Sequence, residues 1–294
     1  MGHSLLYRPF AAARPGWVYG KKGGVWLMRQ IFLALAMAYL LLPSGAAAEE
    51  LTGKKIIEEV RQRHARPVEF EIQRLTLTDK NGTEQVRSLK RYSRTVGPGE
   101  QRYLMVFHSP KTIRGAAIVT WKRRFKKDGQ WLYLPANGGK PVRVLEGNKT
   151  NFVMGTDFTG EDLSFENPDD LEFERQTDEV IDGDSHYVVD VTAKDKTLKQ
   201  ETGYKFRRLW IDKKNYFVMR TDYYDRRGKL VKRQTASDVK KIEDDMWRAT
   251  VQVMENFEKK HKTQVEVLER DFDVSSVPVD IFFQRTLISG DHVR

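Results

Sequence analysis

The feature that most constrains this fold is an alternation of apolar and polar residues that begins after Pro67 and persists along most of the remaining chain. In "VEFEIQ", for example, Val68, Phe70 and Ile72 alternate with glutamates and a glutamine. Residues two apart lie on the same face of an extended strand, so this period predicts β-structure and not helix. About ten to eleven such segments follow one another, with turn signals such as Asn81-Gly82 between them. Short turns between successive strands predict an antiparallel meander and not repeated βαβ units.

A sheet of that many strands is expected to curl strongly. Two of its segments, "QRYLMVF" and "GAAIVTW", are apolar on both faces, so we expect both of their sides to be covered. Ahead of the strands, "LTGKKIIEEVRQRH" has the pattern of one amphipathic helix, which Thr52 can cap and whose apolar stripe is Ile56, Ile57 and Val60. One short helix and a loop leave room on the concave face for a ligand cavity.

The first 48 residues carry no acidic side chain and contain the pattern of a secretory signal peptide. Arg29 precedes the apolar run 31–42, and Ala46 and Ala48 form an A-x-A cleavage site. That run spans about 18 Å as a helix, well short of a bilayer core of about 30 Å. We therefore expect an upstream leader over residues 1–27, a signal peptide over 28–48 that is cleaved near Ala48/Glu49, and a single domain over 49–294.

The chain has no cysteine. This excludes disulfides, zinc-thiolate sites and a cysteine nucleophile, so an exported chain of this kind must be held together by its own core. The formal net charge of +10 falls to +5 without residues 1–48, because they carry five basic residues and no acidic ones. The remaining charges are interspersed, so we expect no nucleic acid partner. A mildly basic surface is compatible with an anionic membrane.

Motifs for catalysis or metal binding are missing from the sequence. It contains no nucleophile elbow, metalloprotease helix, phosphate-binding loop or dinucleotide-binding fingerprint. His64, His108, His186 and His261 share no metal-ligand spacing, and we assign no metal, cofactor or catalytic residue. A carboxylate pair for glycoside hydrolysis would have to lie about 5–10 Å apart, which a sequence does not reveal. A hydrolase therefore stays open as an alternative.

Three carboxylates stand close together in "VMGTDFTGEDLSF", residues 153–165. With the "ENPDD" that follows they could bind calcium, although the alternating order of an EF-hand loop is missing. Thr159-Gly160-Glu161-Asp162 has instead the order of a capping box, which would place acids in the first turn of a helix, where its dipole favours them. Asn167-Pro168 resembles a second helix start. We favour capping, and the apolar residues of the stretch are then one side of a lid.

Aromatic residues are the candidates for a binding cavity, because they lie mostly on predicted strands or beside this lid. Ordinary core packing is the other interpretation of the same residues. The candidates for the cavity wall and lid are Trp121, Trp131, Tyr133, Phe152, Phe158, Leu163, Phe165, Trp210, Tyr216 and Trp247.

Five segments of the chain resemble a known protein family. They are "FHSPKTIRGAAIVTW" (107–121), "WLYLPANGGKPVRVL" (131–145), "MGTDFTGEDL" (154–163), "RRLWIDKKNYFVMRTDYYDRRGKLVK" (207–232) and "VPVDIFFQRTL" (277–287). In these segments and in their order, the chain resembles an outer-membrane lipoprotein-sorting protein of the LolA-like superfamily. The resemblance covers almost all of residues 49–294.

The resemblance implies a mainly β protein in the periplasm of a Gram-negative-type envelope. Its large curved antiparallel sheet would form an unclosed barrel, with short helices as a lid over an apolar cavity. The cavity would hold acyl chains of lipoproteins or lipids, which the protein would carry between membranes or to an RND-type transporter. Separately, we expect the protein to be a monomer. The alternative is a lipid or envelope sensor that does not transport, or an accessory subunit of an RND-type lipid exporter.

Overall fold

The computed structural model of the protein describes residues 51–123, 128–145, 150–163 and 168–293. The expected leader and signal peptide lie outside the described residues. Residues 51–294 form one compact unit. Within the described ranges, every helix is too short or too polar to cross a membrane.

Thirteen antiparallel strands form a single sheet with the order β6-β5-β4-β3-β2-β1-β13-β12-β11-β10-β9-β8-β7. Apart from the pairing of β1 with β13, each strand pairs with its neighbours along the chain, which is the predicted meander. Because β6 and β7 stand at opposite edges, the sheet is an unclosed barrel. The strands are β1 (Val68–Thr78), β2 (Glu84–Gly97), β3 (Glu100–Ser109), β4 (Ala117–Lys122), β5 (Gly129–Tyr133), β6 (Val142–Arg143), β7 (Leu171–Ile181), β8 (Asp184–Ala193), β9 (Tyr204–Asp212), β10 (Val218–Asp225), β11 (Leu230–Glu243), β12 (Met246–Asn256) and β13 (His261–Asp271).

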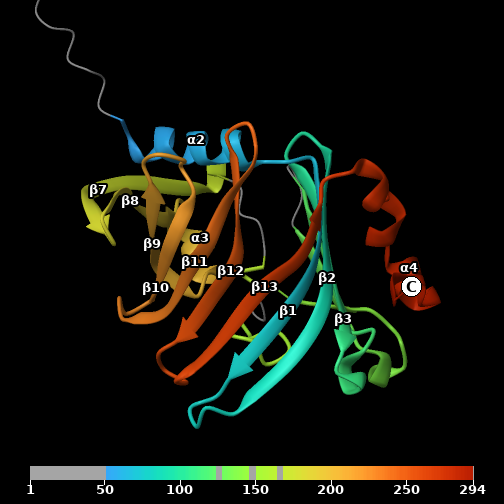
Figure 1. Ribbon diagram of the computed structural model, residues 1–294. Helices are drawn as coiled ribbons and strands as arrows, with labels where there is room; N and C mark the ends of the chain where they lie inside the picture. Colours follow the sequence, from blue (N-terminus) through green and yellow to red (C-terminus); the bar gives the residue numbers. More distant parts are fainter. Residues whose placement is uncertain (1–50, 124–127, 146–149, 164–167, 294) are drawn as a thin grey trace, which may run out of the picture. The chain divides into compact units, whose positions relative to one another are not determined.

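The predicted amphipathic helix is α2 (Gly53–His64), and it lies across one end of the curled sheet (Figure 1). The hydroxyl of Thr52 accepts a hydrogen bond from the amide of Lys55 at 3.3 Å, as an N-cap does. Ile56 and Ile57 are buried against apolar residues of β8 and β9. Among the described residues, the other α-helices are α3 (Lys196–Glu201) and α4 (Gln284–Ser289), and single 3₁₀ turns span Lys111–Ile113, Pro135–Asn137, Pro168–Asp170, Val274–Ser276, Val279–Phe282 and Asp291–Val293.

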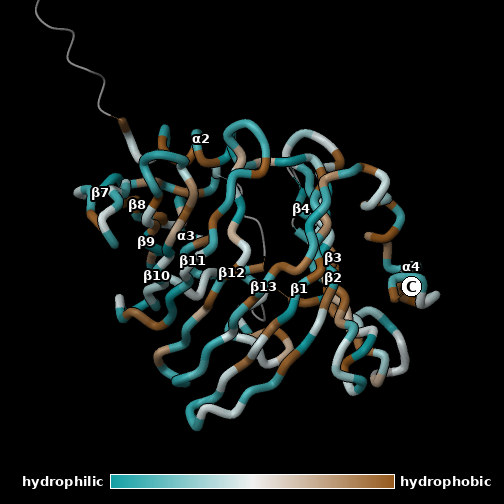
Figure 2. The backbone as a smooth tube through the Cα atoms, viewed as in Figure 1, coloured by the Kyte–Doolittle hydropathy of each residue, from teal (hydrophilic) through white to brown (hydrophobic). Residues whose placement is uncertain are grey.

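Strands β3 and β4 carry buried residues on both faces, as the two-sided apolar segments predict. On β3, Leu104 and Val106 point to one face and pack beneath the C-terminal segment 277–293, which runs along the outside of the sheet (Figure 1). Met105 and Phe107 point to the other, inner face. Figure 2 shows how hydrophilic and hydrophobic residues are distributed along the strands. The inner face is the concave side of the curl, and the candidate site lies there.

Candidate ligand-binding cavity

A cavity of about 370 Å³ opens on the inner face of the sheet, between its central strands and the loop 150–163. This volume is near the lower end of the range of about 300–1,000 Å³ that is usual for small-molecule sites. Residues two apart on a strand share a face, and β1 accordingly contributes Glu69, Glu71, Gln73 and Leu75 to the wall. The rest of the lining is Arg91, Tyr103, Met105, Phe107, Val153, Thr156, Phe158, Asp162, Leu163, Phe217, Gln234, Arg248, Ala249, Gln252, Val265, Val267 and Arg270.

The lining is of mixed chemistry, which corrects the expectation of an apolar cavity. Strand register separates the two kinds of lining residue: Glu71 lies opposite Arg91 and Arg270, whereas Leu75, four residues along β1, lies opposite Val265 on β13. On β2, Leu75 lies opposite Arg87, which does not line the cavity and donates to the carbonyl of Met154. At about 3.3 Å per residue these rows are roughly 13 Å apart. The cavity therefore has a charged end near the start of β1 and an apolar end farther along that strand.

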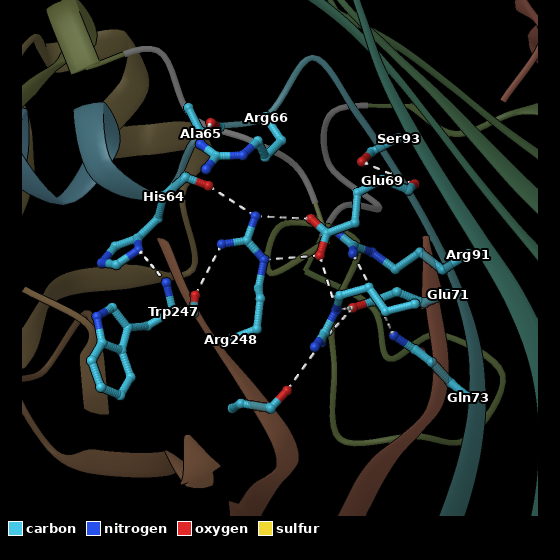
Figure 3. Close-up of polar contacts among 12 residues, drawn as sticks. His64, Ala65, Arg66, Glu69, Glu71, Gln73, Arg91, Ser93, Trp247 and Arg248 are labelled. Carbon is cyan, nitrogen blue, oxygen red and sulfur yellow. Dashed lines mark hydrogen bonds and ion pairs between the residues drawn. The ribbon is translucent and has the colours of Figure 1, made fainter. Parts of the chain in front are cut away.

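The charged end is a network of two glutamates and three arginines, part of which Figure 3 shows. Arg248 donates from Nε to Glu69 Oε1 at 2.8 Å, and Arg270 donates from Nε to Glu71 Oε1 at 2.9 Å. Arg91 donates from Nη1 to Glu71 Oε2 at 2.9 Å. Burial alone would raise the pKa of Glu71, but Arg91 and Arg270 outweigh it and hold that pKa below its ordinary value. Glu71 is therefore ionised at neutral pH although it is only 4% exposed.

This charged network had no motif to mark it in the sequence. Glu69 and Glu71 belong to the polar half of the "VEFEIQ" alternation, the half that ordinarily faces water in an antiparallel sheet. In the structure this half faces the cavity, because the C-terminal segment covers the other face and packs on Val68 and Phe70. Arg248 and Arg270 come to the same place from β12 and β13, far along the chain.

The loop 150–163 covers the apolar end through Phe158 and Leu163, two of the residues predicted to form a lid. Phe158 packs against the buried cluster that contains Leu75, Phe107 and Val265. Since the loop carries three carboxylates, its position depends on how they are bound.

Asp162 makes the contacts of the predicted capping box. The amide of Thr159 donates to Asp162 Oδ2 at 2.7 Å, and the amide of Asp162 donates to the Thr159 hydroxyl at 3.2 Å. Residues 161–163 form a turn, and the described residues stop there until Pro168. The predicted lid residue Phe165, and Asn167 of the second predicted cap, lie outside the described residues. Asp162 also accepts from the Tyr204 hydroxyl at 2.7 Å and pairs with the ammonium of Lys232.

Asp157 fastens the other part of the loop to β13. Its Oδ2 lies 2.6 Å from His261 Nδ1 and accepts a hydrogen bond from the Thr263 hydroxyl at 2.7 Å. The described parts of the chain contain no group of three or more acids or histidines placed to hold a metal ion. The acids of the loop thus anchor it to β9, β11 and β13, and no calcium site is found among the described residues.

The other aromatic candidates lie elsewhere. Trp121, Trp131 and Tyr133 pack on the outer face beneath the C-terminal segment, where Trp121 Nε1 donates to the carbonyl of Phe282 at 2.8 Å. Successive residues of a strand point to opposite faces, and the alternate residues Ile118, Gln130 and Leu132 line a separate hollow on the inner face. The three aromatic side chains are therefore on the outer face. Ordinary core packing is the better description of these three residues.

Four more candidates are also placed apart from the cavity lining. Phe152 lies beside Lys259, whose Nζ is 3.3 Å from the centre of its ring. Trp210 is buried and donates to Glu179 at 2.9 Å. Tyr216 packs in the cluster beneath α2, where burial raises the pKa of its hydroxyl to about 12. Trp247 lies next to α2, and its amide donates to His64 Nδ1 at 3.3 Å.

Three solved structures are similar in fold to this chain. An outer membrane lipoprotein-sorting protein domain from Vibrio parahaemolyticus is 26% identical with a TM-score of 0.74, and the match covers 80% of this chain and 98% of that one. A DUF1329 family protein from Desulfovibrio piger is 25% identical with a TM-score of 0.73, covering 80% and 97%. A LolA superfamily protein from Nitrosomonas europaea, at 19% identity and a TM-score of 0.62 over 79% and 97%, shares the fold.

Sequence comparison adds one family. A search of curated proteins finds no match. A family model described as "Uncharacterized protein" matches residues 99–289, which is well over half of the chain. The chain therefore belongs to that family, and its fold is the one seen in these lipoprotein-sorting, DUF1329 and LolA superfamily structures.

Proposed function

We propose that this protein is a periplasmic carrier that binds an acyl chain of a lipid or lipoprotein in the inner-face cavity and transfers it between membranes or to a transporter. The observation that carries the proposal is the cavity itself, whose apolar end lies between the sheet and the anchored loop 150–163. The kinship with lipoprotein-sorting and LolA superfamily proteins supports the same function.

The energetics of transfer explain why such a cavity would be needed. Exposing an acyl chain to water costs about 0.8 kcal/mol per methylene, so a sixteen-carbon chain faces roughly 12 kcal/mol in crossing an aqueous compartment unaided. Contact with Leu75, Phe107 and Val265 at the apolar end would offset part of that cost. Transfer then requires no covalent step.

The carboxylates in the cavity are held in ion pairs, which favours a binding function over hydrolysis. Among the described lining residues, Glu69 and Glu71 are held by arginines, and Asp162 is held by Lys232. A general base must be able to accept a proton from the reacting group. Carboxylates that are already paired with buried cations are poorly suited to that role.

Val267 is the position from which occupancy of the cavity is best tested. It lines the cavity from β13, and a Val267→Trp variant would place an indole where the ligand is expected. We expect a fluorescent fatty-acid probe to bind roughly tenfold more weakly or worse, since excluding two methylenes at about 0.8 kcal/mol each suffices for that loss. Fluorescence titration measures the change.

A matched control separates blocked binding from general damage. Val86→Trp makes the same substitution on β2 at a side chain that is 55% exposed, and probe affinity should stay unchanged. A wild-type protein that binds no probe and retains no lipid by mass spectrometry would contradict the proposal. Exchange of labelled lipid between two vesicle populations then tests transport, because a sensor would bind lipid without accelerating exchange.

A further inference from the structure

The charged end of the cavity holds one more positive than negative charge. Its arginines are Arg91, Arg248 and Arg270, and its acids are Glu69 and Glu71. The other acid of the lining, Asp162, is already neutralised by Lys232. A surplus positive charge at one end of a cavity favours an anionic group of a ligand at that end.

Two of these arginines are already engaged on several sides. Arg248 donates to Glu69 and to the carbonyls of His64 and Trp247. Arg270 donates to Glu71 and to the carbonyl of Ala249. Their side chains are 13% and 12% exposed, so they form the fixed frame of the charged end.

Arg91 differs from both. Within the described parts of the chain its only hydrogen-bond partner is Glu71, through Nη1, although a guanidinium carries five N–H donors. Its side chain is 33% exposed and stands on the inner face of β2, where it lines the cavity. Arg91 therefore has donors available toward the cavity.

Glu71 does not depend on Arg91 alone. Its Oε1 accepts from Arg270, and its Oε2 also accepts from the side-chain amide of Gln73 at 2.7 Å. Arg270 and Gln73 therefore remain as hydrogen-bond partners of Glu71 when Arg91 also contacts a ligand.

We propose that Arg91 binds the anionic headgroup, a carboxylate or a phosphate, of an amphiphile whose chain runs to the apolar end of the cavity. The inference rests on the proposed function and deepens it, because it names the chemical class of the ligand: an anionic single-chain lipid. Guanidinium groups pair bidentately with carboxylate and phosphate oxygens, and such charge-assisted bonds are strong. From the row of Arg91 and Glu71, the chain extends toward Leu75 and Val265.

The test compares hexadecanoate with hexadecanol, which have the same chain length and differ in headgroup charge, as competitors of a fluorescent probe. An Arg91→Gln variant should bind hexadecanoate roughly 10–100-fold more weakly, the loss expected for a hydrogen-bonded charged group. Its affinity for hexadecanol should be nearly unchanged. Arg91→Lys should restore part of the affinity for hexadecanoate.

Arg74→Gln is the matched control, since Arg74 stands on the outer face of β1 and is 51% exposed. It should leave the affinities for both ligands unchanged. Thermal unfolding followed by circular dichroism confirms that each variant is folded. Displacement by lysophosphatidate but not by excess inorganic phosphate would support a lipid headgroup, whereas displacement by inorganic phosphate through Arg91 would overturn the assignment of an amphiphile.

The outcomes separate the two claims. Equal wild-type affinity for hexadecanoate and hexadecanol, or an equal loss of both in Arg91→Gln, would overturn the role of Arg91 and leave chain binding intact. Failure of the wild-type protein to bind either ligand would overturn the proposed function, and the headgroup assignment with it.

Discussion

Replacing Lys232 with methionine is expected to lower the free energy of unfolding by about 3–5 kcal/mol, because it breaks a buried ion pair and leaves one charge without its partner. The ammonium of Lys232 pairs with Asp162, and the two side chains are only 3% and 2% exposed. The ammonium also lies 4.9 Å from the centre of the Tyr223 ring, so the site favours a cation. Equilibrium unfolding in urea measures the loss.

An exposed ion pair provides the control. Lys240 and Asp238 lie 3.0 Å apart with side chains that are 64% and 45% exposed, so Lys240→Met should cost at most about 1 kcal/mol. A double variant, Lys232→Met with Asp162→Asn, should recover part of the stability because it removes the stranded charge. If Lys232→Met and Lys240→Met lowered the free energy of unfolding by the same small amount, the Lys232–Asp162 pair would not be a buried anchor of the loop.

Removing the Lys232 anchor should also loosen the loop that covers the cavity. The loop would keep the contacts of Asp157 with His261 and Thr263, so we expect local opening and not complete release. Limited proteolysis should therefore cleave within 150–163 faster in Lys232→Met than in Lys240→Met.

Replacing Phe282 with alanine is expected to cost about 3–5 kcal/mol, the usual loss for a buried phenylalanine. Phe282 is 1% exposed and anchors the C-terminal segment on the outer face, against Leu104, Val106 and Val119. Because this face is opposite the cavity, the affinity for a fatty-acid probe should stay the same while the protein remains folded. Urea unfolding and probe titration measure the two quantities.

Ile288 is a suitable comparison within the same C-terminal segment. It is 60% exposed, so Ile288→Ala should change the free energy of unfolding by no more than about 0.5 kcal/mol. If the folded Phe282→Ala variant bound the probe much more weakly, the cavity could not lie on the inner face, opposite the C-terminal segment. That result would instead favour the interpretation in which Trp121 and Trp131 form the cavity wall.

The architecture could be predicted from the sequence because it depends on local patterns. The period of two, the two-sided apolar strands and the capped helix each lead directly to an element of the structure. The ten to eleven strands that the sequence predicts fall short of the thirteen in the sheet, because β5 and β6 are short and β7 lacks a clear alternation. On β7 frequent acids such as Glu172 and Glu174 hide the pattern, and charges of this kind suit an edge strand.

The site was harder to predict, because the sequence does not say which face of a strand will enclose the cavity. Glu69 and Glu71 alternate with Val68 and Phe70 in the way expected of residues facing water. Their burial depends on the C-terminal segment, which covers the opposite face from some two hundred residues away along the chain. Of the aromatic and lid candidates that the structure describes, only Phe158 and Leu163 line the cavity, because the loop that carries them is anchored over it.

A crystal structure with hexadecanoate brominated at its terminal methyl group tests the central claim most directly. The bromine should give an anomalous peak at the apolar end, beside Leu75, Phe107 and Val265, with the carboxylate at Arg91. A peak on the outer face, near Trp121 and Trp131, or only on the protein surface would contradict the binding of an acyl chain in this cavity.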